Sequence, residues 1–271
     1  MKKSAIVIII LCMAISMVTV GQDIRPFVVG EKTDLHSKYN NRNYEISVFL
    51  PENYSKDSTK YSCLYLFYGG DPKFLSASGI VTALSDATWE IPKLIIVGVT
   101  NMQWFCDLTP VPLKGMEDKT GGAKDFLNFV TNDLFKFIDS RYKTTDHRIF
   151  MGHSFGGLFG VYSFLENPKS FKDYILISPS LAIRADYIQE ALKQKILNRN
   201  DELENKMYFS LGSEEESRYL KSALWLIEGL ESKKLKNLKW KHEVHPGKNH
   251  HTVAPISLMN GLLYVFGKEN K

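Results

Sequence analysis

The sequence predicts an α/β fold in which a mostly parallel central sheet is covered by helices on both faces. Short apolar runs that end in Gly, Ser or Asn recur along the chain, and longer stretches with apolar residues three and four positions apart lie between them. No internal repeat and no low-complexity linker interrupts this alternation. Alternating strand and helix patterns are typical of βαβ units joined by right-handed crossovers.

Residues 1–21 are predicted to be a secretory signal peptide. Two lysines precede an apolar run from Ala5 to Val20, and Gly21 follows it. A retained membrane anchor is the alternative, although the run is shorter than the roughly 20 residues that a spanning helix needs. Lipid attachment at Cys12 is not expected, because Leu11 stands where a lipoprotein signal has a small residue. We therefore expect export to the periplasm or the cell exterior, without stable membrane insertion.

Residues 22–271 are expected to form a single domain, since about 250 residues can build one core without disulfides. The formal net charge falls from +4 to +2 without Lys2 and Lys3, and no basic block is interleaved with aromatic residues, so nucleic acid is not a predicted partner. Cys63 and Cys106 form no CxxC motif and no Cys/His pair at metal spacing, so no metal is expected. Two unpaired thiols are favoured over a disulfide between them.

The predicted strands are of two kinds. Residues 44–51 alternate apolar and polar side chains, as does the strand-like segment 240–247, so each is expected to have one solvated face. The others are short apolar runs that suit parallel strands buried on both faces, at residues 62–70, 93–101, 147–154, 174–180 and 206–213.

The predicted helices lie between these strands. The strongest pattern covers residues 123–142, and the segment 158–168 is also helical in pattern. Weaker patterns occupy residues 185–197, 216–235 and 255–268. In open sheets of this kind, reactive groups collect at the carboxyl ends of the strands, so candidate site residues are expected there.

Ser154 is the candidate nucleophile. It stands in the sequence GHSFG at residues 152–156, which fits G-x-S-x-G between an apolar strand and a helical segment. A sharp strand-to-helix turn needs glycines two residues before and two after the serine, because side chains there would collide. The alternative is that Ser154 only caps the following helix and that the glycines serve packing.

A serine nucleophile needs a base, and in this class of fold the chain order is serine, acid, histidine. Of the four downstream histidines, His242 and His245 alternate within a strand-like segment and are expected to be structural. His250 and His251 lie in the polar loop 247–255, which suits an exposed imidazole. Spacing alone does not decide between these two.

The acid is expected just after the strand that precedes this region. Glu214, Glu215 and Glu216 follow residues 206–213 directly, and one of them would accept the imidazole N–H and fix its tautomer. The alternative is that all three are favourable charges in the first turn of the next helix. Asp186 is a second choice for the acid.

An oxyanion needs two preorganised donors, and the backbone N–H of Phe155, directly after the serine, would be one of them. The second is expected in the loop after an early strand, where Gly69, Gly70 and Asp71 let the backbone approach a substrate. A plain glycine turn is the alternative.

Taken together, these blocks resemble the putative-esterase family of α/β-hydrolases, which includes enterochelin-type siderophore esterases, feruloyl esterases and S-formylglutathione hydrolases. The resemblance runs from about Tyr44 to Phe266 and implies an α/β-hydrolase fold. The blocks that carry it are LYLFYGGDPKFLSASGIV, DLTPVP, GGAKDFLNFV, GHSFGG, LGSEE and NHHTVAPISLMNGLLYVF.

The resemblance also implies roles for individual residues. It places the nucleophile at Ser154 and the acid at Glu215, three residues after Gly212. It places the base at His250, because Thr252 and Val253 then lie in the family's register.

The resemblance places the oxyanion donors at Phe155 and Gly70. Relatives often have an arginine just before the Asp-Leu-Thr-Pro block, whereas this chain has Trp104 and Phe105 there, so an aromatic contact is expected in place of a cationic one. These two residues and His153, next to the serine, are the predicted substrate contacts.

The predicted function is that of a secreted serine esterase that works through an acyl-enzyme without metal or organic cofactor. Its substrate would be a siderophore ester, a feruloyl or acetyl group on a polysaccharide, or a simple acyl ester. Two alternatives use the same cleft: acyl transfer to an acceptor other than water, and a catalytically silent protein that binds a ligand there.

Overall fold

The computed structural model describes residues 27–56, 58–197, 204–232 and 238–267. The predicted signal peptide at residues 1–21 lies outside these described residues and stays a prediction. None of the described helices is long and apolar enough to cross a membrane.

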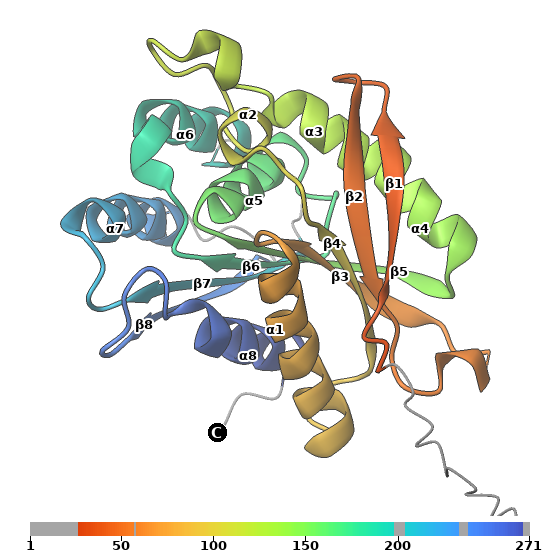
Figure 1. Cartoon of the computed structure of the whole chain (residues 1–271). Coiled ribbons are helices and arrows are strands. Elements are labelled where there is room, and N and C mark those ends of the chain that lie inside the picture. The colour runs from red at the N-terminus through yellow and green to blue at the C-terminus, as the bar shows by residue number, and fades with distance from the viewer. Residues whose placement is uncertain (1–26, 57, 198–203, 233–237, 268–271) are drawn as a thin grey trace, which may run out of the picture.

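The strands form one eight-stranded sheet in the order β1-β2-β4-β3-β5-β6-β7-β8 (Figure 1). β2 pairs antiparallel with β1 and β4, and all other neighbours are parallel. The strands are β1 (Glu31–Ser37), β2 (Arg42–Phe49), β3 (Tyr61–Phe67), β4 (Leu94–Val99), β5 (Thr144–His153), β6 (Asp173–Ile177), β7 (Lys206–Gly212) and β8 (Lys239–His245). The predicted α/β class with a mostly parallel sheet is confirmed.

Helices cover both faces of the sheet. α1 (Asp71–Thr82) and α8 (Ala254–Val265) pack on one face, and the remaining long helices pack on the other (Figure 1). The latter are α3 (Ala123–Phe129), α4 (Phe135–Arg141), α5 (Phe155–Glu166), α6 (Ala185–Ala191) and α7 (Ser217–Ser232), and the short α2 (Trp104–Asp107) lies above them at the sheet's carboxyl edge. π-helical turns join α3 to α4 and extend α1 and α6.

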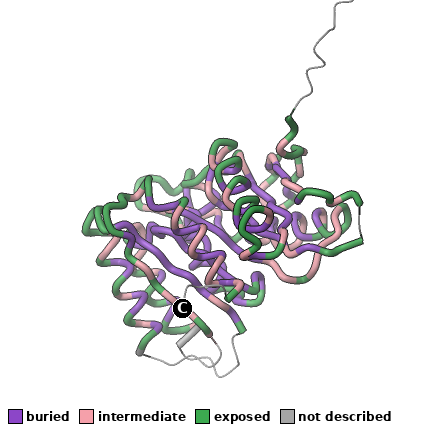
Figure 2. Tube along the Cα trace, turned by 90° about the horizontal axis from the view of Figure 1, so that it is seen from below, coloured by how far each residue is buried: buried purple, intermediate pink, exposed green. Residues whose placement is uncertain are grey.

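The central strands are apolar because both of their faces are buried. In β3, Leu64 and Leu66 pack under α1 and α8, while Cys63, Tyr65 and Phe67 pack on the opposite side. Side chains that alternate between two buried faces explain why the sequence shows continuous apolar runs there. Figure 2 shows the buried stretches concentrated in these strands and on the inward sides of the helices.

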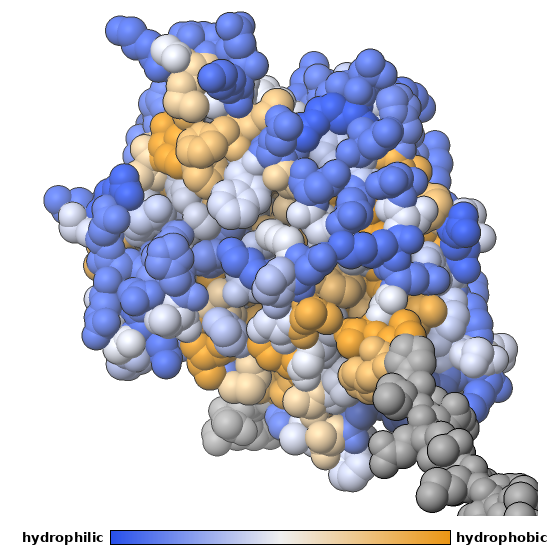
Figure 3. Space-filling view, viewed as in Figure 1, coloured by the Kyte–Doolittle hydropathy of each residue, from blue (hydrophilic) through white to orange (hydrophobic). Residues whose placement is uncertain are grey.

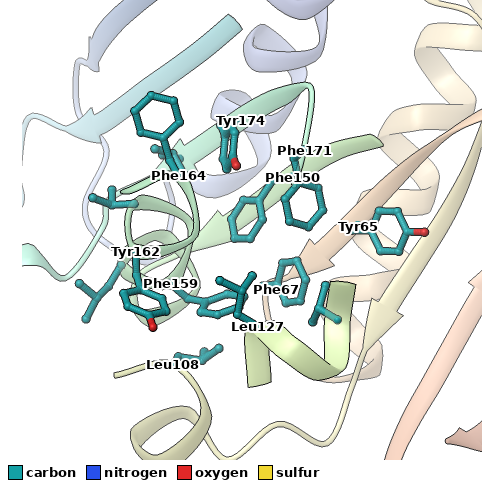
Figure 4. Packing of buried hydrophobic residues seen from close by; sticks show 14 of the residues in the cluster. Tyr65, Phe67, Leu108, Leu127, Phe150, Phe159, Tyr162, Phe164, Phe171 and Tyr174 are labelled. Carbon is teal, nitrogen blue, oxygen red and sulfur yellow. The ribbon is translucent and has the colours of Figure 1, made fainter. Parts of the chain in front are cut away.

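Aromatic rings dominate the core beneath α5. Phe67 and Phe150 stack with ring centroids 4.7 Å apart, and Phe159 of α5 meets Phe67 edge to face at 5.3 Å (Figure 4). Phe171 packs against Phe150 at 5.1 Å. These rings are almost fully buried, so α5 rests on a rigid aromatic layer built on β3 and β5.

The elements that the sequence patterns do not predict include β1 and α1. β1 is an edge strand whose side chains are mostly exposed, so it carries no apolar signal. α1 begins at Asp71 with Pro72 in its first turn, directly after the glycine pair for which the sequence predicts only a loop. Its start therefore had the acidic residue and the proline that favour a helix N-terminus.

Candidate active site

Ser154 occupies a sharp turn between β5 and α5. Its backbone has φ 59° and ψ −115°, a conformation that non-glycine residues rarely adopt. The Ser154 N–H donates to the carbonyl of Ile177 on the neighbouring β6 at 3.0 Å, and α5 begins at the next residue. This turn holds the serine at the carboxyl edge of the sheet.

The glycines on either side of Ser154 are required by close backbone packing. A Cβ on Gly156 would lie 1.7 Å from the carbonyl oxygen of Phe67, and a Cβ on Gly152 would lie 2.2 Å from the carbonyl oxygen of Gly156. The turn therefore presses the start of α5 against the end of β3, and only glycine fits.

Ser154, His250 and Glu215 form a chain of hydrogen bonds. His250 Nε2 lies 2.9 Å from Ser154 Oγ, and His250 Nδ1 lies 3.1 Å from Glu215 Oε2. A carboxylate only accepts hydrogen bonds, so Nδ1 of a neutral His250 carries the proton and Nε2 is free to accept from the serine hydroxyl. The structure thus brings these three sequence-predicted residues together.

Glu215 is fixed by further donors. Its Oε1 accepts from the Gly212 N–H at 2.8 Å and from the Ser178 hydroxyl. Burial acts to raise the pKa of the Glu215 carboxyl, but the hydrogen bonds from His250, Gly212 and Ser178 outweigh it and lower the pKa below its usual value. The side chain is fully buried and stays ionised.

The loops that carry the acid and the histidine are tied to each other. The Glu214 N–H donates to the Lys248 carbonyl at 2.9 Å, and the Gly247 N–H donates to Ser213 Oγ at 2.9 Å. These bonds join the loop after β7 to the loop after β8, so they fix the positions of Glu215 and His250 relative to each other.

The other candidate acids do not reach the imidazole. Glu214 is exposed, and Glu216 pairs with Arg218 at 3.0 Å. Asp186 is 72% exposed and pairs with Arg184 at 2.9 Å. Of the acids considered from sequence, only Glu215 therefore meets His250.

The other downstream histidines also lie apart from the serine hydroxyl. His251 is exposed at the cavity rim, with its ring 5.6 Å from that of His250. His242 stacks on Trp240 within β8, and His245 at the end of β8 contacts Tyr208 at 3.2 Å.

His153 supports the loop that carries His250. Its Nε2 lies 2.7 Å from the His250 carbonyl oxygen and must donate, because a carbonyl oxygen only accepts. Its ring packs 4.8 Å from the His250 ring and 5.5 Å from the Tyr68 ring. Burial, helped by the nearby His250, lowers the pKa of His153 to about 3, so this ring is neutral near pH 7.

A cavity of about 440 Å³ opens beside Ser154. Trp104 and Phe105 of α2 line it, both about half exposed, and His153 forms part of its wall, so the three predicted substrate contacts all border the cavity. The remaining lining is mostly apolar or aromatic and includes Tyr68, Met102, Leu108 and Phe155. Figure 3 shows apolar side chains gathered over α2 at this edge of the molecule.

The two predicted oxyanion donors lie at the starts of helices. Phe155 is the first residue of α5, where the N–H has no intrahelical acceptor, and it lines the cavity. Gly70 caps the start of α1 directly after Gly69, which lines the cavity.

Several residues of the site were not predicted from the sequence. Ser178 and Ser180 follow β6: Ser178 donates to Glu215, and Ser180 Oγ lies 3.1 Å from Ser154 Oγ. Their place at the carboxyl end of the predicted strand 174–180 was the available signal. Tyr219 packs its ring 4.4 Å from that of His250, and Lys73 lines the cavity from α1.

A second serine–histidine–aspartate set lies at the opposite edge of the sheet. His147 Nδ1 lies 3.1 Å from Ser62 Oγ, and His147 Nε2 lies 2.7 Å from Asp173 Oδ2. All three residues are within strands, near the amino ends of β3, β5 and β6. Ser62 therefore has neither a sharp turn nor a helix start beside it, and the set cross-links the sheet.

Cys63 and Cys106 are both free thiols. Within the described ranges, no group of three or more His, Cys, Asp or Glu side chains is arranged to hold a metal ion.

A family model described as Putative esterase matches residues 37–259. The structure superposes on an IroE-like serine hydrolase from Shewanella oneidensis with a TM-score of 0.82 and 24% sequence identity, covering 88% of this chain and 80% of that one. The BES protein from Bacillus cereus superposes with a TM-score of 0.78 and 27% identity, covering 91% and 98%. In sequence, the ferri-bacillibactin esterase BesA of Bacillus subtilis is 40% identical over 62 residues, which is 22% of each chain.

Proposed function

Because the chain belongs to the Putative esterase family and is a carboxylic ester hydrolase of the α/β-hydrolase type, we propose that it cleaves esters through an acyl-enzyme on Ser154. The observation that carries this proposal is the hydrogen-bond chain from Ser154 through His250 to Glu215, beside the cavity.

In the first half of the reaction, Ser154 Oγ attacks the ester carbonyl carbon while His250 Nε2 takes the hydroxyl proton. The carbonyl π electrons move to oxygen, and the resulting oxyanion accepts hydrogen bonds from the N–H groups of Phe155 and Gly70. The intermediate collapses when the carbon–oxygen bond to the alcohol breaks. The imidazolium of His250 protonates the leaving oxygen, and the acyl group stays on Ser154.

In the second half, water attacks the acyl carbon while His250 takes one of its protons. Collapse of this intermediate releases the carboxylic acid, and His250 returns the proton to Ser154 Oγ. Glu215 stabilises the imidazolium in both halves, and its lowered pKa keeps it charged for this task.

The substrate class is a separate part of the proposal. BesA is named as a ferri-bacillibactin esterase. For this chain, we propose an ester substrate with an aromatic or other apolar part. The aromatic side chains of Trp104 and Phe105 at the cavity support this choice, because flat apolar groups pack well against them.

The direct test is hydrolysis of p-nitrophenyl butyrate by the chain from Gln22 onward. We expect turnover by the unmodified protein and a loss of at least about a thousandfold in kcat for Ser154→Ala. Ser62→Ala is the matched control, because Ser62 also contacts a histidine that meets an aspartate.

Equal activity of Ser154→Ala and the unmodified protein would refute the proposal. A folded protein that turned over no ester would instead favour ligand binding in the same cavity.

A further inference from the structure

Lys73 places a cation inside the cavity beside Ser154. It lies in the first turn of α1, and its Nζ is 4.8 Å from the Tyr68 ring centroid and 5.6 Å from that of Trp104. Both rings line the same cavity as Ser154 and His250. The ammonium group is thus held against aromatic faces, where a cation is attracted to the π electrons.

No carboxylate of the described residues pairs with Lys73. The acid nearest in sequence, Asp71, pairs instead with Lys32 at 2.8 Å. Burial lowers the pKa of the Lys73 ammonium, and among the described residues no acid counters this effect. The aromatic rings offset part of the lost hydration, but they do not neutralise the charge.

The Lys73 side chain also runs along the loop that ends β3. A Cβ built on Gly69 would lie 3.1 Å from Lys73 Cδ and 3.6 Å from its Nζ. Gly69 precedes Gly70, the proposed second oxyanion donor, so the ammonium group lies beside the region where the substrate carbonyl would sit.

We propose that Lys73 makes the enzyme prefer esters that carry an anionic group, such as a carboxylate, within reach of the cavity. This inference rests on the proposed function of Ser154. The substrate anion would supply the negative charge that pairs with Lys73. The aromatic side chains exclude water from part of this ion pair, and this exclusion strengthens the attraction.

The test compares an anionic ester with a neutral ester of equal acyl length. The pair is p-nitrophenyl hemiadipate and p-nitrophenyl hexanoate, assayed with the unmodified protein, Lys73→Met and Lys73→Arg. The readout is the ratio of kcat/KM for the anionic ester to kcat/KM for the neutral one. We expect Lys73→Met to lower this ratio about tenfold and Lys73→Arg to keep most of it. High salt is expected to lower the ratio for the unmodified protein.

A second pair places the anion on the leaving group: 4-acetoxybenzoate against 4-acetoxybenzamide. A drop in the ratio for Lys73→Met on either pair supports the inference and assigns the side of the ester that Lys73 contacts. Lys124→Met is the matched control, because Lys124 is exposed on α3 and the substitution changes the net charge equally.

Two results would overturn the inference. One is an unchanged ratio in Lys73→Met on both pairs. The other is an equal loss of kcat/KM on anionic and neutral esters in Lys73→Met. That result would mean that Lys73 stabilises the oxyanion or the fold. If the unmodified protein hydrolysed none of the four esters, the proposed function itself would be contradicted. Failure of the Lys73 inference and failure of the proposed function are therefore distinguishable.

Discussion

Ser154 holds a backbone conformation that a serine adopts only when its surroundings enforce it. Its φ of 59° costs about 1–3 kcal/mol relative to a relaxed residue. The hydrogen bond to Ile177 and the contact of Gly156 with Phe67 enforce that conformation. The strained turn thereby holds the Ser154 hydroxyl 2.9 Å from His250 Nε2.

Glu215→Gln is expected to lower kcat by about a thousandfold or more while leaving the fold intact. A glutamine amide can present an N–H to His250 Nδ1, which favours the wrong tautomer and leaves the imidazolium without its counter-charge. Steady-state kinetics on p-nitrophenyl butyrate and a thermal unfolding curve check both parts.

Glu214→Gln and Glu216→Gln are the matched controls, because both side chains are exposed and neither meets His250. Near-normal activity is expected for each. A loss in either control as large as that of Glu215→Gln would contradict the assignment.

His153→Asn is expected to make the protein less sensitive to acid. His153 has a folded pKa of about 3, against about 6.5 when unfolded, so the unfolded chain binds more protons between these values. The stability that neutral His153 contributes is complete above pH 6.5 and is lost as the pH falls toward 3. Urea unfolding at pH 7 and pH 5 measures how far the free energy of unfolding falls between these pH values. We expect this decrease to be smaller by about 2 kcal/mol in the variant than in the unmodified protein.

An equal decrease in the free energy of unfolding in both proteins would show that protonation of His153 does not affect the pH dependence of stability. The same variant is expected to lower kcat more than it changes KM, since His153 contacts the backbone of His250.

For single residues, the sequence predicts Ser154 as the candidate nucleophile but not its full surroundings. Ser154 was identifiable because its motif lies between a strand and a helix. The choice among residues 214–216 depends on the residue at which β7 ends. The apolar pattern of the sequence does not fix this end to within one residue. Ser178, Ser180 and Tyr219 reach the site through contacts between segments far apart in the chain, which local patterns do not encode.

The start of α5 is the element on which the site depends most. It is pressed so closely against the end of β3 that Gly156 has no room for a side chain. Phe155, the residue before Gly156, lines the same cavity as Gly69. Packing of one helix on one strand therefore sets the position of both the hydroxyl and a proposed oxyanion donor.

Gly156→Ala is expected to lower the free energy of unfolding by about 3 kcal/mol, because its Cβ would lie 1.7 Å from a backbone oxygen. Gly79→Ala in the middle of α1 is the control, since nothing lies within 4 Å of its added Cβ. It should raise stability by about 0.5–1 kcal/mol, as alanine favours a helix over glycine. Chemical denaturation measures both, and a destabilised Gly79→Ala with an unaffected Gly156→Ala would contradict the packing described here.

The elements that sequence reasoning found are those with buried faces. The five apolar runs all became strands of the parallel part of the sheet, because burial on two faces leaves a continuous signal. β1 is exposed at the edge, and α1 has a mixed pattern after a glycine pair, so neither left a periodic trace. α2 is a single turn, too short for periodicity to appear.

Across the whole molecule, two sets of serine, histidine and acid side chains have similar distances but different surroundings. Ser62, His147 and Asp173 lie within hydrogen-bond distance at one edge of the sheet, much as Ser154, His250 and Glu215 do at the other. Only the latter set combines a strained turn, the start of a helix and an aromatic cavity. The doubly covered parallel sheet provides these at the carboxyl ends of its strands.

We predict that the chain is exported and that the exported protein begins at Gln22. Expression of the full chain with its first 21 residues, followed by intact-mass measurement of the periplasmic or secreted fraction, checks this cleavage. A protein of full mass in the membrane fraction would instead support the retained anchor.

In the proposed reaction, Ser154 forms the covalent intermediate. Treatment of the chain from Gln22 onward with a fluorophosphonate probe, followed by peptide mass spectrometry, tests it most directly. We predict one adduct on Ser154, an adduct of equal yield in Ser62→Ala, and none in Ser154→Ala. An adduct on another residue, or equal labelling of Ser154→Ala, would contradict the claim.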